Sequence, residues 1–197
     1  MERWILIFYR APSEPSSARV SAWRRLHRLG AVFVGPSACL IPLRLQPEAG
    51  LADIANGLQG AGGTLDAYRV EAFADEAEAG LEARYSAARN EEYAELLERA
   101  QGVVDELKRE GAKGKFTFAE VDENEADLVK LRRWLRRIRS RDLFQASGRA
   151  AAEAAINAAE AMLDSFAQIA SARDDQSLVH LPQQSPEPAP SPSPQRG

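Results

Sequence analysis

The order of segments in residues 1–73 constrains the fold more than any other feature of this sequence. A continuous apolar run, residues 4–9 (WILIFY), is bounded by Arg-Ala-Pro and indicates a buried central strand. The segments that follow predict a helix, two short strands joined by a turn at residues 35–37 (GPS), a second helix, and a last strand over residues 64–73. This order is typical of ferredoxin-like βαββαβ folds. We therefore predict a ferredoxin-like α/β domain over residues 1–73.

The apolar spacing within the two predicted helices of this domain indicates which side chains face its core. Ser16 or Ser17 is a suitable N-cap for the first helix, and Gly30 a suitable stop. The second helix begins after Pro47. The residues expected to face the core are Val20, Trp23 and Leu26 in the first helix, and Leu51, Ile54 and Leu58 in the second.

From residue 75 the sequence becomes helical. It predicts helices over residues 75–110 and 116–144 and an alanine-rich third helix, so that the fold class is α+β with a three-helix domain over residues 74–172. The predicted core positions are Tyr85, Tyr93, Leu97, Val104 and Leu107 in the first of these helices and Ile156, Ala159, Leu163, Phe166 and Ala170 in the third. Residues 173–197 are rich in Pro, Ser and Gln, which predicts a disordered tail.

The helix predicted over residues 116–144 has an acidic first half and a basic second half. Thr117 and Glu120 form a capping box at its start, and Phe116 is placed to pack on Val121. The stripe expected to be buried consists of Leu128, Leu131, Leu135 and Ile138. The helix dipole accounts for the sign of the charges at each end. It does not account for six arginines within residues 132–141.

Two groups of arginines are candidates for binding an anion or nucleic acid. Arg133, Arg136 and Arg137 point away from the predicted stripe, whereas Arg132 and Arg139 lie at its border. The second group lies around the first helix and consists of Arg19, Arg24, Arg25 and Arg28. A solvated surface is the competing interpretation for both groups, and the sequence leaves it open. Trp23 and Trp134 are interpreted as packing residues rather than as platforms for base stacking.

Composition limits the classes of protein to consider. No apolar run approaches the roughly 20 residues that cross a bilayer, and the first residues lack a signal-peptide pattern. The single cysteine, Cys39, excludes an internal disulfide framework, so we expect a cytoplasmic protein with no membrane partner. The formal net charge of −4 argues mildly against DNA binding. Local charge matters more, because salt screens charges beyond about 10 Å at roughly 0.1 M.

The sequence predicts that the chain is not an enzyme and binds no cofactor. It has no glycine-rich phosphate loop, no HExxH and no CxxC pair, and its two histidines, His27 and His180, are far apart. The best metal candidate is a set of carboxylates, which would suit a metal-dependent phosphodiesterase if they converged. They are Glu92, Glu120, Glu123 and Asp127. We favour the alternative that they form salt bridges, with Arg89 and Arg141 among the partners, or cap helices, and we expect a cation close to Asp127.

Several segments resemble one known family. They are residues 4–34 (WILIFYRAPSEPSSARVSAWRRLHRLGAVFV), 89–93 (RNEEY), 116–120 (FTFAE), 123–127 (ENEAD), 131–134 (LRRW) and 141–144 (RDLF). Together they make residues 3–170 similar to the N-terminal module of ChrB-type chromate-resistance regulators. The resemblance implies a DNA-binding transcriptional regulator or accessory protein, with DNA as partner and chromate or another oxyanion as effector. It also makes a sensor thiol at Cys39 conceivable, although we expect that residue to be buried and inert.

The resemblance has one departure and one limit. Members of the family commonly continue into a C-terminal module, whereas this sequence continues into the proline-rich tail, so we expect oxyanion sensing to be absent or supplied by a separate protein. The first strand and helix also resemble the ferredoxin-like domains of phenylacetate-type repressors and of small CRISPR adaptor nucleases. Arg10 stands where those nucleases have a metal-binding aspartate, which argues against nuclease chemistry. The remaining alternative is a non-catalytic interaction module that forms a homodimer.

Overall fold

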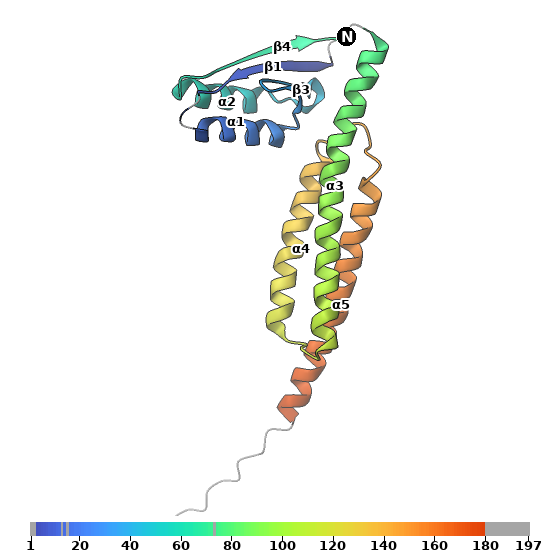
Figure 1. Ribbon diagram of the computed structural model, residues 1–197. Helices are drawn as coiled ribbons and strands as arrows, with labels where there is room; N and C mark the ends of the chain where they lie inside the picture. Colours follow the sequence, from blue (N-terminus) through green and yellow to red (C-terminus); the bar gives the residue numbers. More distant parts are fainter. Residues whose placement is uncertain (1–2, 13, 15, 73, 180–197) are drawn as a thin grey trace, which may run out of the picture.

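The computed structural model describes residues 3–12, 14, 16–72 and 74–179 and has the predicted α+β architecture. A small domain with a four-stranded sheet lies at one end of a long three-helix bundle (Figure 1). The strands are β1 (Trp4–Arg10), β2 (Val32–Gly35), β3 (Ala38–Pro42) and β4 (Thr64–Val70). The helices of this domain are α1 (Ser16–Leu29), the short 3-10 helix η1 (Leu43–Leu45) and α2 (Glu48–Gly60).

The sheet has the strand order β2-β3-β1-β4, and every pair is antiparallel, consistent with the predicted ferredoxin-like fold. The apolar run 4–9 lies within β1, which pairs with both β3 and β4 and is thus central, as predicted. Alternate residues of β1, such as Ile5 and Ile7, pack with α1 and α2 in one hydrophobic core. Cys39 on β3 belongs to the same core.

The core face of α2 is confirmed, and that of α1 is partly wrong. Leu51, Ile54 and Leu58 are buried as predicted. In α1, Leu26 is buried, but Val20 and Trp23 are exposed, and Ala22 takes the inner position. Ala22, which is small, and Leu26 lie four residues apart on α1 and form the narrow stripe of the helix that packs on the sheet. Trp23 lies beside that stripe and packs instead against the ring of His27, with 4.2 Å between centroids.

The bundle consists of α3 (Asp75–Ala112), α4 (Phe118–Arg139) and α5 (Arg149–Val179). The predicted stripes of α4 and α5 are buried at every named position. In α3 one prediction is wrong, because Leu97 is exposed and its neighbour Leu96 is buried. Leu96 lies three residues after Tyr93 and four before Ala100, which keeps it on the face that contacts α4 and α5.

The predicted ends of the helices need two corrections. Thr117 caps α4 as predicted, because its hydroxyl accepts a hydrogen bond from the Glu120 amide at 3.3 Å. That helix ends at Arg139 instead of residue 144, and the loop after it is held by Asp142, which accepts from the Tyr93 hydroxyl at 3.0 Å. Helix α5 continues to Val179, into the segment predicted as a tail, and residues 180–197 lie outside the described residues. Within the described part of the chain, no helix is both long and apolar enough to cross a membrane.

An aromatic cluster joins the sheet domain to the bundle. Trp4 of β1 lies 6.2 Å from Tyr85 of α3 and 6.0 Å from Phe144, between ring centroids. The Trp4 indole donates to the Glu78 carboxylate on α3 at 3.0 Å. Gly30, which ends α1, has a φ of +92°, and a Cβ there would approach the Tyr85 hydroxyl to 3.0 Å. Glycine is thus required at position 30 both by the backbone conformation and by the closeness of the two domains.

Candidate functional site

A cleft of about 750 Å³ lies where the sheet domain meets the bundle. Three parts of the chain line it: the C-terminal end of α1, the middle of α3, and the C-terminal end of α4 with the loop that follows. Its charged and polar lining residues include His27, Arg28, Arg89, Glu92, Arg137 and Arg141. Since they come from both domains, the cleft exists only in the assembled tertiary structure.

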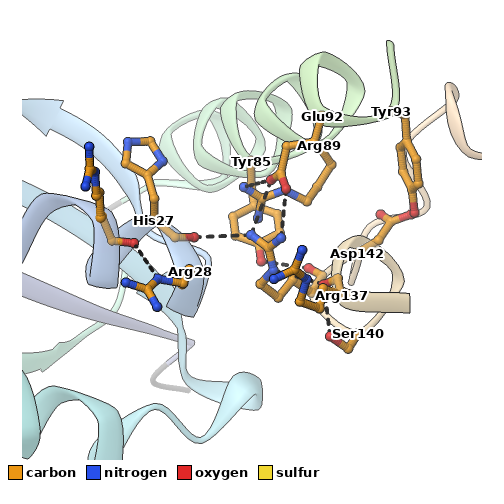
Figure 2. A network of polar contacts seen from close by, with 11 residues as sticks. His27, Arg28, Tyr85, Arg89, Glu92, Tyr93, Arg137, Ser140 and Asp142 are labelled. Atoms are coloured by element: carbon orange, nitrogen blue, oxygen red, sulfur yellow. Dashed lines mark hydrogen bonds and ion pairs between the residues drawn. The ribbon is translucent and has the colours of Figure 1, made fainter. Parts of the chain in front are cut away.

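Glu92 is the centre of a polar network in this cleft (Figure 2). Its carboxylate accepts from Arg89 at 2.8 Å and from Arg141 at 2.7 Å. Arg141 also donates to the carbonyl oxygen of His27 at 3.2 Å and to that of Arg137 at 3.0 Å. A single guanidinium group therefore connects the end of α1 with α3 and α4, so the two domains share one set of hydrogen bonds.

Arg89 forms the floor of the cleft and is only 2% exposed. Its guanidinium lies over the Tyr85 ring, 4.8 Å from the ring centroid. Its Nε and Nη1 atoms are buried and have no hydrogen-bond partner among the described residues. The Tyr85 hydroxyl donates to the Arg141 carbonyl oxygen at 2.7 Å, and burial raises the pKa of that hydroxyl. A cation this deeply buried is rare in a folded protein, and here Glu92 and the Tyr85 ring stabilise it.

His27 lies half-buried at the edge of the same network. Burial lowers the pKa of its imidazole; Glu92 acts in the opposite direction, and Arg89 and Arg141 reinforce the lowering. The imidazole is therefore neutral at pH 7, and the positive charge of the cleft comes from arginine.

The structure brings together only some of the arginines named from the sequence. Arg28 and Arg137 both line the cleft, although 109 residues separate them in the chain. Arg25 instead contacts α2, through the Asp53 carbonyl at 3.2 Å and its carboxylate at 3.7 Å. The others are exposed on α1 or α4 and make no salt bridge within the described part of the chain; they are Arg19, Arg24, Arg133 and Arg136.

The border arginines of α4 have structural partners on α5. Arg132 binds the Glu160 carboxylate and donates to Asn157 at 3.1 Å. Arg139 lies 3.4 Å from the Glu153 carboxylate. These two arginines hold α4 against α5. The outward arginines of the same helix, Arg133, Arg136 and Arg137, do not have this structural role.

The carboxylates considered as a metal site do not converge. Glu92 lies at the junction, whereas Glu120 and Glu123 lie in the first turns of α4, at the other end of a helix roughly 30 Å long. Among the described residues, no three histidine, cysteine or acidic side chains are placed to hold a metal ion. The predicted salt bridges to Arg89 and Arg141 are confirmed for Glu92 alone. The cation expected beside Asp127 is Lys130, at 2.7 Å.

Cys39 and Trp134 have the structural roles predicted for them. Cys39 is fully buried, and burial raises the pKa of its thiol to about 12, which suppresses the reactive thiolate. Trp134 is half-buried against the bundle core and borders the cleft. Its ring centroid is 5.8 Å from the guanidinium carbon of Arg99.

Sequence reasoning missed the floor of the cleft. From the sequence, Arg89 is expected only as a salt-bridge partner and His27 only as a histidine far from His180. One signal was present: Arg89 lies four residues after Tyr85 and four before Tyr93, on the buried face of α3. A charged residue in that position needs a polar environment inside the fold, which is how the site could have been found.

Comparison with known proteins identifies the family. None of the curated proteins and none of the solved structures compared with the chain gave a match. The family model described as "Protein ChrB, N-terminal" matches residues 19–176, which include most of α1, all but the end of the bundle and every residue that lines the cleft. The chain therefore belongs to the ChrB N-terminal family, which is associated with chromate resistance.

Proposed function

We propose that this chain is a DNA-binding regulator, or an accessory protein of such a regulator, in chromate resistance, and that it binds DNA phosphates through arginines of α1 and α4. The observation that carries the proposal is the convergence of Arg28 and Arg137 on one cleft. Two segments that are distant in sequence thus contribute arginines to one surface. Phosphate attraction depends on such local density more than on net charge.

The pairing of the other arginines supports this assignment. Arg132 and Arg139 are engaged by α5, whereas Arg133 and Arg136 on the same helix face outward and make no salt bridge within the described residues. Arg24 lies one turn before Arg28, and its carbonyl oxygen accepts from the Arg28 side chain at 3.4 Å. Exposed guanidinium groups without carboxylate partners are the groups that bind phosphate without first breaking a salt bridge.

The proposed contacts position the protein on DNA and do not read its sequence. Phosphate contacts fix register and orientation, and base-edge contacts specify sequence. No Asn or Gln accompanies the outward arginines of α4, so we assign no direct base readout to them. This function requires the compartment that holds DNA, in agreement with the cytoplasmic location expected from the sequence.

The salt dependence of DNA affinity tests the proposal. Replacing Arg133, Arg136 and Arg137 together by Gln should weaken binding and make the slope of log K against log salt shallower by up to about three, because each lost phosphate contact contributes about 0.9. A matched control removes the same charge from α3, at exposed residues outside the cleft. It is the triple substitution of Arg84, Lys108 and Arg109 by Gln. Fluorescence anisotropy with a labelled duplex measures both variants.

The double variant Arg24→Gln/Arg28→Gln tests the α1 half of the surface. We expect a slope shallower by up to about two. Equal slopes for the wild type, the two cleft variants and the control would contradict DNA binding through this surface. Equal losses of DNA affinity in the α4 variant and in the control would show that the effect comes from the net charge of the protein and not from the position of the arginines.

A second candidate function, homodimerisation, is favoured by one observation on the sheet. Phe8 and Tyr68 are 47% and 54% exposed, and their ring centroids are 6.5 Å apart on the face opposite α1 and α2. Asp66 and Arg10 project from the same face, so a second copy packed by a two-fold axis meets opposite charges there. Sedimentation equilibrium decides: Phe8→Ser/Tyr68→Ser should dissociate a dimer, and a monomeric wild type at micromolar concentration would contradict this candidate.

A further inference from the structure

We propose that Trp23 of α1 is a stacking platform for an unpaired base, so that the arginine surface described above holds a single strand of DNA. This inference rests on the proposed function, because the same arginines supply the attraction for phosphate. It adds a contact to a base, which phosphate contacts do not provide. Bases in a duplex are covered by their neighbours, whereas an unpaired base offers its ring face to an aromatic side chain.

The exposure of Trp23 is the first argument. At 46%, Trp23 is the most exposed tryptophan of the chain; Trp4 is 1% exposed, and Trp134 is half-buried against the bundle core. Val20, three residues earlier on α1, is 42% exposed and extends the apolar strip. A stable protein interface needs roughly 20–30 residues on each side. This strip is far smaller, and it has the size of a single planar ring.

Two neighbouring rings hold the indole of Trp23 in place. His27, on the next turn of α1, lies 4.2 Å away and Phe33 of β2 lies 6.5 Å away, between ring centroids. The rings of His27 and Phe33 are themselves 4.8 Å apart, so both support the indole from the same side. The rest of the indole surface is open to a ligand. A ring that is fixed before binding loses little conformational entropy when a base stacks on it.

The charge around Trp23 favours a polyanion. Helix α1 contains four arginines and no acidic residue. Arg19 lies four residues before Trp23 on the same face, and Arg24 follows Trp23 directly. Arg19 and Arg24 are exposed and make no salt bridge within the described part of the chain. The phosphates on either side of a base stacked on Trp23 therefore have guanidinium groups nearby, as in proteins that bind single strands.

Trp23 lies beside the junction cleft and not inside it. His27, which lines the cleft, follows Trp23 by four residues, or about 6 Å along the helix. A strand bound at Arg28 and Arg137 can therefore continue along α1 to the indole (Figure 1). Trp23 lines neither this cleft nor the hollow between α1 and α2. An amphipathic peptide helix docks in a groove, whereas a base needs only a flat ring, so the geometry favours a single strand over an acidic peptide.

An oligonucleotide without bases tests the stacking directly. Fluorescence anisotropy compares a labelled thymidine oligonucleotide with one of equal length built from abasic sites, which keeps every phosphate. The wild-type chain should bind the thymidine strand at least about fivefold more tightly, which is the lower limit for one base stacked on an aromatic side chain. Equal affinities for the two strands would overturn the proposal.

Substitutions of Trp23 locate the platform. Trp23→Ala should bind the thymidine strand at least about fivefold more weakly and the abasic strand as the wild type does. Its slope of log K against log salt should not change, because no phosphate contact is lost. Trp23→Phe should keep part of the affinity and Trp23→Leu should not, since leucine is apolar but has no ring. Wild-type affinity of Trp23→Ala or Trp23→Leu for the thymidine strand would overturn the proposal.

The matched control is Tyr68→Ala. Tyr68 is 54% exposed on the face of the sheet opposite α1, so this substitution removes an aromatic side chain of similar exposure away from the arginines. Its affinity for both strands should equal that of the wild type. A loss equal to that of Trp23→Ala would overturn the assignment to Trp23.

Indole fluorescence gives a second measurement that does not depend on affinity. In a Trp134→Phe background the exposed indole is that of Trp23, because Trp4 is buried. A base stacked on the indole quenches its emission, so the saturating thymidine strand should quench it and the saturating abasic strand should not. Equal quenching by the two strands would overturn the proposal.

The arginine variants separate a failure of this inference from a failure of the proposed function. If Arg24→Gln/Arg28→Gln makes the salt slope shallower for both strands while Trp23→Ala changes no affinity, phosphate binding stands and the platform is overturned. If the wild type binds neither strand and no duplex, both proposals are overturned. An acidic amphipathic peptide that binds the wild type but not Trp23→Ala, together with equal binding of the two strands, would assign the platform to a protein partner and overturn the single strand.

Discussion

The two ends of the helical bundle stabilise their charges in different ways. At the junction end, Arg89 and Glu92 are three residues apart on α3, but Arg141 joins them from 49 positions further along the chain, and the three side chains are at most 25% exposed. At the far end, residues 110–130, the ion pairs are local: Lys113 lies 2.7 Å from Glu110 and Lys130 lies 2.7 Å from Asp127, each three residues apart. Lys113, Lys130 and Asp127 are at least half exposed, whereas Glu110 is 12% exposed and is neutralised by lysines that reach it from the surface, Lys113 and Lys115.

The ion pairs at the junction hold the two domains together, whereas those at the far end connect neighbouring turns or loops of the bundle. Exposed ion pairs contribute little to stability, because water and salt screen them. A buried pair that loses one member leaves an uncompensated charge and is costly. The junction is therefore where single substitutions should have large effects on stability, and the following predictions test that contrast.

Glu92→Gln should have the largest effect. It leaves Arg89 and Arg141 without their shared carboxylate, so we expect a loss of roughly 3 kcal/mol in the free energy of unfolding. Urea unfolding measures the loss. A loss no larger than that of an exposed pair would show that solvent reaches the junction freely and would remove the contrast between the two ends.

Tyr85→Phe should have the next largest effect. The Tyr85 hydroxyl donates to the Arg141 carbonyl oxygen at 2.7 Å, and its removal leaves that oxygen with the Leu143 amide, at 3.1 Å, as its remaining donor. The expected cost is about 1.5 kcal/mol. Thermal unfolding measures the cost. Tyr93→Phe is the comparison, because the Tyr93 hydroxyl bonds to Asp142 within the bundle. A loss of the same size in that variant would show that removing any buried tyrosine hydroxyl has this cost, whether or not it lies at the junction.

Thr117→Ala should destabilise the far end by about 1 kcal/mol, the usual cost of losing an N-cap hydroxyl. The hydroxyl accepts from the Glu120 amide at 3.3 Å. Thr117→Ser keeps the acceptor and serves as the control. Because the cap does not depend on the sheet domain, urea unfolding should give the same difference at low and high salt.

Asp127→Asn should change stability by less than about 0.5 kcal/mol. Its partner Lys130 is 72% exposed and keeps its hydration when the carboxylate is removed. Chemical unfolding at low ionic strength gives the most sensitive measurement. A loss comparable with that of Glu92→Gln would mean that position along the bundle, and not burial, determines the cost.

The smallest effect is a difference in pH dependence. Burial lowers the pKa of His27 in the folded state, so the unfolded chain binds the proton more readily. The folded state is therefore fully stable, as far as His27 is concerned, above about pH 6.5. It loses stability as the pH falls below that value. The hydrogen bond from Lys113 lowers the pKa of Glu110, whose contribution is present above 4.5 and is lost as pH falls through the folded pKa. His27→Gln should therefore flatten the stability profile just below about pH 6.5 and leave the more acidic limb unchanged. An unchanged profile would contradict the junction assignment of His27.

The start and the buried stripe of α4 could be predicted from the sequence alone. Thr117, the stripe of Leu128, Leu131, Leu135 and Ile138, and the start of α4 follow from local spacing, and the structure confirms them. The order of strands was predictable for the same reason, since alternation and turn residues act over a few positions. Three local predictions, the burial of Val20, Trp23 and Leu97, are wrong, because helix spacing alone does not fix the exact angle at which a helix meets its neighbours.

The cleft was decided by the tertiary structure. The sequence determined that Arg28, Arg137 and Glu92 are charged and lie on helices, and that Arg89 lies on the face of α3 that carries Tyr85 and Tyr93. It did not determine that α1 ends beside α3, or that Arg141 reaches the His27 carbonyl across 114 positions of the chain. Periodicity reports only on neighbours within one element, whereas burial of a charge depends on which surfaces meet. The meeting of the two domains at Gly30 therefore made Arg89 the floor of a site.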